Sequence, residues 1–338
     1  MEVINYKIDG LLSDYSDLIV DIYRDYPDVA RTKVEEARKI NNISNPFFNF
    51  GSVDNFLLLD QGKPVAHAAV ITDSRLPAEL ALLGCFESKN NQVYADKIFD
   101  AISEHARQLG RKILRGPINL TTWQNWRVSF PEDRQPFSLE PFCRAYYKDL
   151  FENANFEIAQ QNVSTISSLK DCGFTNFAQD FSEVVANGFV FEHINEKNYQ
   201  ASLQAIFQMI SEVFVDSWSF AKISLEEFAH YYKDLDRTST LPFSCLVLDK
   251  KKCAAAFCFA VADVSDSDRV IIKTFAVGSK FQGQAIGKAM FYWVYQQAKK
   301  QNVKEFIFST MREDNQGILN LTKGADIYRY YRAYQKQI

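Results

Sequence analysis

The sequence predicts an α/β protein built from two tandem copies of one domain, each a mixed, mostly antiparallel sheet flanked by helices. Two distant stretches support this, residues 57–70 (LLLDQGKPVAHAAV) and 246–259 (LVLDKKKCAAAFCF). Each has an apolar strand, an aspartate, three turn residues and a second strand of small and apolar residues. This pattern is typical of a β-hairpin with a short polar turn. The two hairpins indicate an internal duplication.

The segments that follow the hairpins match in the same order. Residues 80–88 (LALLGCFES) align with residues 269–277 (RVIIKTFAV), which places Phe86 opposite Phe275. A turn, a helix, a basic residue and a short apolar strand come next in both halves. The helices are predicted over residues 93–109 and 285–300, and the strands are RKILRG and VKEFIFST. Both halves therefore have the order strand, strand, strand, helix, strand.

We place the boundary between the copies near residues 184–194, where Asn187-Gly188 punctuates the chain. The first domain is then 1–187 and the second 188–338. A long amphipathic helix, NYQASLQAIFQMISEVFVDSW, is expected at the start of the second domain. The alternative is a single larger mixed sheet.

Composition narrows the class of protein. The chain has 338 residues, 47% of them hydrophobic and 24% charged, and a net charge of -4 without a basic stripe. Nucleic acid is therefore not an expected partner, because phosphate neutralisation needs clustered Lys and Arg. No signal peptide and no membrane-spanning apolar run are expected. The 6 cysteines are scattered, which suggests a cytoplasmic location, and the histidines lack metal-ligand spacing, so no metal is expected.

One turn in the second half has features of an anion site. The stretch SKFQGQAIGKAM carries Gly283 and Gly287 around a predicted helix start, with Lys273, Lys280 and Lys288 nearby and no acidic residue between positions 273 and 290. Backbone N–H groups at a helix N-terminus bind anions, and glycines allow close approach. The same glycines could instead serve only a tight turn. Neither the dinucleotide fingerprint nor the P-loop spacing is present.

The first-half counterpart, SKNNQVYADKIF, keeps the serine and the lysine but loses both glycines. Asp96 stands where Gly287 stands in the second half. A carboxylate in the first helical turn suits the helix dipole but repels a phosphate. The first turn is therefore predicted to be sealed by side chains and the second to be open to an anion.

The second turn resembles the Q/R-x-x-G-x-G/A signature of the GNAT acyltransferase superfamily, with Gln282 and Gly287 on its outer positions. The stretch FIFSTMREDNQGILNLTKGADIYRYYRAYQK resembles the second half of that fold. From about Pro46 onwards the chain is similar to bacterial tandem GNAT-fold proteins, through RGPINLTT, AYYKDLFENANF and DSWSFAKISLEEFAHYYKDL.

The resemblance implies an acyl-coenzyme A, acetyl-CoA or another, in a cleft between two splayed strands of the second domain. Its pantetheine arm would bond to the strand of Phe275, Ala276 and Val277. Its pyrophosphate would bond to the amides of Gln282, Gly283, Gln284, Ala285, Ile286, Gly287 and Lys288, with Asn315 also at the cofactor. The chain departs from the family at Ala285, where glycine is preferred, and in a shorter helix after Asn315 with Thr322 in place of the usual tyrosine. It also departs in WQNWRVSF (residues 123–130), where the family tends to have a polar run after its Arg-Gly-Pro segment.

Acyl transfer to an amine needs a base and a proton source. The strand RVIIKTFAV carries no carboxylate, so Asp263, at the end of the preceding strand, is the candidate base. Tyr328 in DIYRYYRAY is the candidate acid. Trp218 and Phe220 are candidates for the acceptor pocket. Solvation or packing would explain each of these residues equally simply.

The function indicated is an acyl-CoA-dependent N-acyltransferase that acts on a small-molecule or peptide amine through its C-terminal domain, as a monomer or homodimer. The first domain would buttress the second, and Asn119 and Thr121 could face a shared space. One alternative is a catalytically idle acyl-CoA sensor or scaffold. Another is a tRNA-dependent aminoacyl transferase. The negative net charge and the lack of a basic groove argue against it.

Overall fold

A computed structural model of the chain describes residues 1–6, 12–233, 235 and 241–338. Asp234, within one of the stretches that carry the family resemblance, lies outside these residues. The first half contains β1 (Glu2–Tyr6), α1 (Leu12–Ile22), α2 (Pro27–Ile40), β2 (Gly51–Asp60), β3 (Lys63–Asp73), β4 (Leu80–Ser88), α3 (Gln92–Gln108), β5 (Ile113–Gly116), β6 (Val128–Phe130), α4 (Tyr147–Asn153), β7 (Glu157–Ser168) and α5 (Ala178–Ala186).

The second half repeats the order of the first. It contains β8 (Val190–His193), α6 (Tyr199–Val213), α7 (Leu225–Tyr232), β9 (Cys245–Leu248), β10 (Ala254–Ala262), β11 (Arg269–Val277), α8 (Ile286–Lys300), β12 (Glu305–Arg312), α9 (Gln316–Leu321) and β13 (Asp326–Gln337). The predicted unit of three strands, a helix and a strand is therefore present twice, as β2-β3-β4-α3-β5 and as β9-β10-β11-α8-β12.

Local sequence explains several element boundaries. Gln61 and Gly62 both have positive φ, 49° and 74°, as the tight turn of the β2–β3 hairpin requires. Asn91 caps α3 by accepting a hydrogen bond from the Val93 N–H. Ser224 and Glu227 form a reciprocal capping box at the start of α7.

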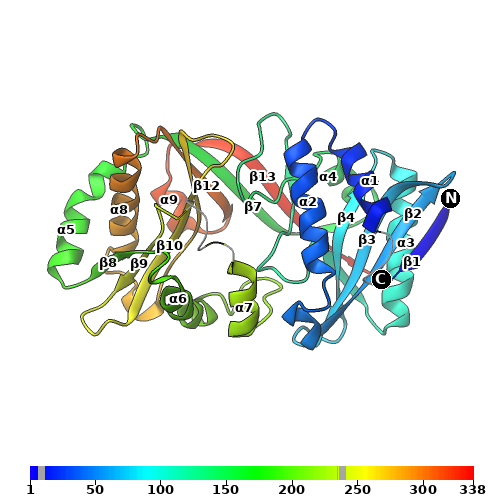
Figure 1. The fold of residues 1–338 in the computed structure, drawn as a ribbon, viewed down its shortest axis with the longest axis horizontal. Helices are drawn as coiled ribbons and strands as arrows, with labels where there is room; N and C mark the ends of the chain where they lie inside the picture. Colours follow the sequence, from blue (N-terminus) through cyan, green and yellow to red (C-terminus); the bar gives the residue numbers. More distant parts are fainter. Residues whose placement is uncertain (7–11, 234, 236–240) are drawn as a thin grey trace.

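The two halves exchange a strand. β7, from the first half, pairs with β12 of the second half, and β13, the last strand of the chain, pairs with β5 of the first half as well as with β7. The result is one continuous sheet of 13 strands. The duplication and the single large sheet are therefore both real, because β7 and β13 cross between the halves (Figure 1). The boundary at 187/188 stays a prediction, and α5, which precedes it, packs on α8.

Helices cover both faces of the sheet. In the first half α3 and α4 pack on one apolar face and α1 and α2 on the other. In the second half α5 and α8 cover one face, whereas α6 and α7 cover the other. Figure 1 shows α2 and α7 facing each other between the halves. Among the described helices, none combines the length and the apolar character needed to cross a bilayer.

Candidate functional site

The strands β11 and β12 run parallel and then part. Their pairing extends from Arg269↔Glu305 to Ile272↔Phe308. Lys273 is the first residue of β11 beyond the last pair. On β12 the chain bends at Thr310, which has a φ of 50°. The edge of a parallel sheet where the strand order opens is a common ligand site.

Side chains of β7 hold the bend at Thr310. The Thr310 N–H donates to Ser164 Oγ over 2.9 Å, and the Thr310 carbonyl accepts from Asn162 Nδ2 over 3.1 Å. These bonds satisfy backbone groups that left the β11–β12 ladder. The exchanged strand therefore keeps the second opening in shape.

The equivalent opening in the first half is closed. β4 and β5 pair as far as Leu82↔Arg115. Beyond that pair the Ile118 N–H donates to the Leu83 carbonyl, and the Cys85 N–H donates to Asn119 Oδ1, both over 2.8 Å. A Cβ added to Gly116 would lie 2.5 Å from the Leu83 carbonyl oxygen. These bonds bridge the space between β4 and β5 that stays open between β11 and β12, although Cys85, Phe86 and Glu87 of β4 line the cavity described below.

The turns before α3 and α8 differ as well. α8 has no side-chain cap and no acidic residue in its first turn, and both Gly283 and Ala285 have positive φ, 79° and 59°. The first amides of a helix lack intrahelical partners and attract anions. At α3, in contrast, Asn91 caps the helix, and Gln92 Nε2 donates to Asp96 Oδ1 over 2.8 Å.

A large cavity of about 1610 Å³ lies between the halves. Residues of α2, the segments 117–127 and 135–143, α6, α7, β11 and β12 line it. Among the sequence-predicted residues, Phe275, Asn315, Trp218 and Phe220 line this cavity, together with Asn119.

The predicted phosphate turn lies next to this cavity, outside its lining. A Cβ added to Gly287 would be 3.8 Å from Cε2 of Phe275, so this phenylalanine separates the turn from the cavity. Ala276 is buried, and neither it nor Val277 lines the cavity. Thr121 is also buried and outside the lining.

Two pairs of aromatic side chains form part of the cavity wall. Trp218 stacks on Trp126 with ring centroids 5.7 Å apart, and Phe220 contacts Trp123 at the same separation. Each pair joins a residue of the second half to one of the first half. The predicted acceptor residues therefore lie at the junction of the halves.

Asp263 lies outside the cavity lining and is saturated with donors. Its Oδ1 accepts hydrogen bonds from the N–H and hydroxyl groups of both Ser138 and Ser265, and its Oδ2 is 3.4 Å from Arg269. Its catalytic role stays a prediction, and its contacts explain it as an anchor for the segment around Ser138.

Tyr328 also has its hydroxyl in use. It donates to the Gln135 carbonyl over 2.6 Å, and its ring packs against Phe137. Burial raises the pKa of Tyr328 above its ordinary value. Its role as the acid stays a prediction, and the bond to Gln135 would have to break first.

Two cations in the cavity did not figure among the predicted site residues. Arg127 Nε donates to Asn162 Oδ1 over 2.9 Å, and its guanidinium lies 3.2 Å from the ring centroid of Trp126. Lys273 Nζ donates to the Leu139 carbonyl over 2.7 Å. Neither has a carboxylate within ion-pair distance among the described residues. Burial lowers the pKa of Arg127 to about 9 and that of Lys273 to about 7, and repulsion from Arg127 adds to the latter.

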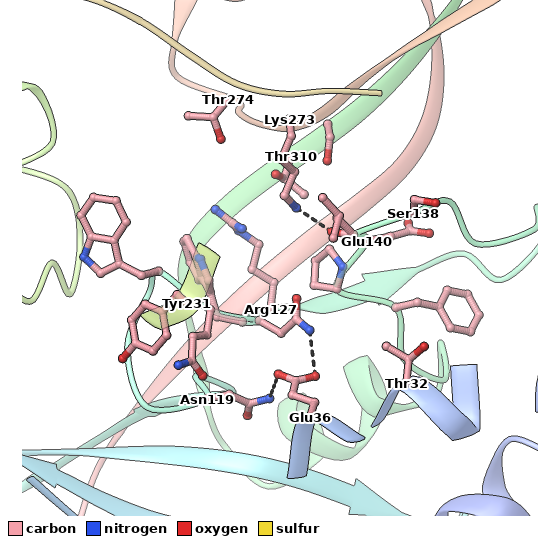
Figure 2. A pocket seen from close by; sticks show the side chains of 18 of the residues that line it. Thr32, Glu36, Asn119, Arg127, Ser138, Glu140, Tyr231, Lys273, Thr274 and Thr310 are labelled. Carbon is pink, nitrogen blue, oxygen red and sulfur yellow. Dashed lines mark hydrogen bonds between the residues drawn. The ribbon is translucent and has the colours of Figure 1, made fainter. Parts of the chain in front are cut away.

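Glu36, on α2, is a third cavity residue absent from the predicted set. Its two oxygens accept hydrogen bonds from Asn119 Nδ2 over 2.9 Å and from Asn125 Nδ2 over 2.8 Å. No cation pairs with it within the described part of the chain. Figure 2 shows Glu36 on one side of the cavity, Lys273 and Thr310 on the opposite side, and Arg127 between them.

The sequence carried a signal for two of these three residues. Lys273 is the one charged residue between apolar neighbours in VIIKTFAV. Arg127 lies in WQNWRVSF, a segment that departs from the family pattern. Glu36 lies in the charged helical stretch TKVEEARKI, where nothing in the sequence distinguishes it from a solvent-exposed glutamate.

Comparisons with known proteins agree with this geometry. Residues 203–323 match the model of the acetyltransferase (GNAT) family. No curated protein sequence matches the chain.

Solved structures similar to this chain share its fold at low sequence identity. A tandem GNAT protein from the clavulanic acid biosynthesis pathway is 12% identical, with a TM-score of 0.61 over 99% of this chain and 98% of the other. A GCN5-related glucosamine N-acetyltransferase region of a fungal GH3 β-N-acetylglucosaminidase is also 12% identical, with a TM-score of 0.62 over 99% of this chain and 38% of the other. A GCN5-related N-acetyltransferase from Anabaena variabilis is 10% identical, with a TM-score of 0.57 over 99% and 73%.

Proposed function

Residues 203–323 belong to the GNAT acetyltransferase family and the whole chain has the tandem GNAT fold, and from this premise we propose an acyl-CoA-dependent N-acyltransferase. Acetyl-CoA is the acyl donor that the proposal favours, and the acceptor is a small-molecule or peptide amine. The observation that carries the proposal is the difference between the two openings. β11 and β12 part into the cavity, whereas Ile118 closes the space between β4 and β5.

The residues of the second half fit an acyl-CoA. The uncapped α8 N-terminus offers amides to a pyrophosphate, and no acidic side chain in its first turn opposes it. Phe275 lies between this turn and the cavity, so an extended arm along β11 would lead from one to the other. A bound thioester supplies an activated acyl carbon.

The chain's own residues then act on the amine. An amine bound as its ammonium form first releases one proton to solvent. The neutral nitrogen then forms a bond to the acyl carbon, the C–S bond breaks, and a second proton passes from nitrogen to the leaving thiolate. Glu36 is a cavity carboxylate without a cation partner among the described residues, and we assign it the attraction of the amine as its ammonium form. The four aromatic rings at the junction give this part of the cavity wall an apolar surface.

Calorimetric titration of the protein with acetyl-CoA tests the proposal. Binding at micromolar concentration, followed by release of free thiol when a panel of amines is added, would support it. Absence of binding at millimolar acetyl-CoA would contradict it.

The saturated contacts of Asp263 and Tyr328 favour a second candidate, an acyl-CoA sensor without turnover. Tight binding of acetyl-CoA with no thiol release for any amine would support the sensor. Thiol release with one amine would exclude it.

A further inference from the structure

We propose that the acceptor amine carries an anionic group, a carboxylate or a phosphate ester, and that Arg127 and Lys273 bind this group in the cavity. The inference rests on the proposed function, because it names the class of acceptor for the same site. It identifies the substrate as an amino-acid-like or phosphorylated amine and excludes a simple polyamine.

Arg127 is held with its donors free. The bond from Nε to Asn162 Oδ1 and the close ring of Trp126 set the orientation of the guanidinium. Within the described residues, its two terminal Nη groups have no hydrogen-bond acceptor. A planar guanidinium with both Nη groups available binds a carboxylate or a phosphate through two parallel hydrogen bonds.

Lys273 brings a second positive charge from the other half of the chain. Its position directly after the last β11–β12 pair directs it into the opening. One of its three ammonium donors is used by the Leu139 carbonyl, and the other two are available. Arg127 and Lys273 therefore meet at the cavity from opposite sides of the junction.

The carboxylate whose charge acts on Lys273 does not neutralise this pair. Glu140 contributes a weak attraction to Lys273, but its Oε1 accepts from Arg329 Nε and from the Tyr331 hydroxyl, each over 2.6 Å. Its Oε2 accepts from the Phe137 N–H. The Glu140 charge is thus balanced by Arg329 inside the core, and it leaves Arg127 and Lys273 without a carboxylate in ion-pair contact among the described residues.

Two half-buried cations that repel each other are costly unless an anion joins them. An anionic ligand removes that cost on binding, whereas a neutral ligand does not. Glu36, on the other side of the cavity, supplies the opposite charge (Figure 2). The cavity therefore matches a molecule with an ammonium and an anionic group, and it repels a ligand that carries only positive charges.

Anion binding can be measured before any acceptor is known. Inorganic phosphate is titrated into the whole protein, with the change in tryptophan fluorescence as the readout, because Trp126 contacts the guanidinium. We expect millimolar binding that weakens at least tenfold in Arg127→Gln and in Lys273→Met. The matched control is Arg31→Gln, a cavity-lining arginine on α2 that is exposed and paired with Asp28, and it should bind as the wild type does. If Arg127→Gln does not fold, Arg127→Lys replaces it. This variant keeps the positive charge but loses the two parallel Nη donors.

Turnover with acetyl-CoA and matched amine pairs then tests the acceptor class. The pairs are glycine with glycinamide and O-phosphoethanolamine with ethanolamine. We expect the anionic member of at least one pair to have a kcat/KM at least tenfold higher. Arg127→Gln should remove this preference through KM. The two pairs distinguish a carboxylate from a phosphate.

Three results would overturn the inference. One is phosphate binding that does not depend on Arg127. Another is equal turnover of the charged and neutral members of both pairs. A third is an Arg127→Gln variant whose affinity for acetyl-CoA, rather than for the acceptor, falls tenfold, since the pair would then hold a cofactor phosphate. If the wild type fails to bind acetyl-CoA while Arg127-dependent phosphate binding persists, the acyl transfer is wrong and the anion site stands.

Discussion

Gly84 and Lys273 occupy equivalent positions in the two halves, each on the strand that parts from its parallel neighbour. At Gly84 a Cβ would lie 2.4 Å from Ile71 Cδ1 and 2.7 Å from the Ile118 carbonyl oxygen, so the chain closes over it. At Lys273 the strands stay apart and the side chain enters the cavity. The half with glycine at this position has lost the opening between its parallel strands. The half with lysine has kept it.

Gly84→Ala should lower the free energy of unfolding by about 2 kcal/mol, because a new methyl group meets backbone that cannot move away. Urea denaturation measures this. Gly287→Ala is the matched control, since its Cβ would make an ordinary 3.8 Å contact with Phe275 at a helix start, and it should leave stability equal or higher. Equal effects of the two substitutions would contradict the closed opening.

Gly287→Asp should weaken acetyl-CoA binding at least tenfold, because it places a carboxylate in the first turn of α8, as Asp96 stands in the first turn of α3. A charge at about 4 Å from a phosphate costs at least 1 kcal/mol. Calorimetry measures the affinity. Gly287→Ala should bind acetyl-CoA as the wild type does, and Asp96→Gly should leave the affinity for acetyl-CoA unchanged. A weaker affinity in Asp96→Gly would move the cofactor to the first half.

Ala285→Gly should raise the free energy of unfolding by about 1 kcal/mol. Ala285 has a φ of 59°, a left-handed conformation in which a Cβ is unfavourable. Thermal or urea denaturation measures the gain. Ala289→Gly, in the interior of the same helix, should have the opposite sign because glycine weakens a helix there. Destabilisation by Ala285→Gly would show that alanine is not strained at this position.

The repeated sequence predicted both copies of the fold because apolar alternation and turn residues are local signals. The hairpin ends, α8 and the helix cap at Asn315 all follow from neighbours in the chain. The exchange of β7 and β13 did not follow, because pairing between β5 and β13 depends on contacts more than two hundred positions apart.

The candidate site was predictable only in part, for a related reason. Trp218, Phe220, Phe275 and Asn315 were chosen because each lies within or beside a motif, and all four line the cavity, while their roles stay predictions. Asp263 was chosen for its place at a strand end, but its function as an anchor depends on Ser138 in the other half. The cavity itself forms from both halves, and no local pattern encodes which side chains meet there.

Asp263→Asn and Tyr328→Phe should each lower stability by about 1–3 kcal/mol and change kcat less than threefold, because their polar atoms serve contacts within the protein. Urea denaturation and initial rates with the best amine measure the two effects. Glu36→Gln should instead raise the KM for the amine, because the charge is lost, and it should lower stability by about 1 kcal/mol, because the amide can accept only one of the two hydrogen bonds from Asn119 and Asn125. A large loss of kcat in Tyr328→Phe at unchanged stability would restore the catalytic assignment.

The charge of Lys273 gives a stability difference that depends on pH. Burial lowers its pKa from 10.5 to about 7, and Arg127 adds repulsion. Below pH 7 the lysine is charged in both the folded and the unfolded protein, so the cost of burying the charge is fully present. Between pH 7 and pH 10.5 the folded protein binds fewer protons than the unfolded one, so this cost falls as the pH rises. Lys273→Met should therefore be more stable than the wild type at pH 6, by about 1–2 kcal/mol after allowing for partial solvation, and the difference should shrink towards pH 10. Urea denaturation of both proteins across this range measures it. A difference that does not change with pH would mean that Lys273 stays fully solvated, and the positive pair at the cavity would lose its second member.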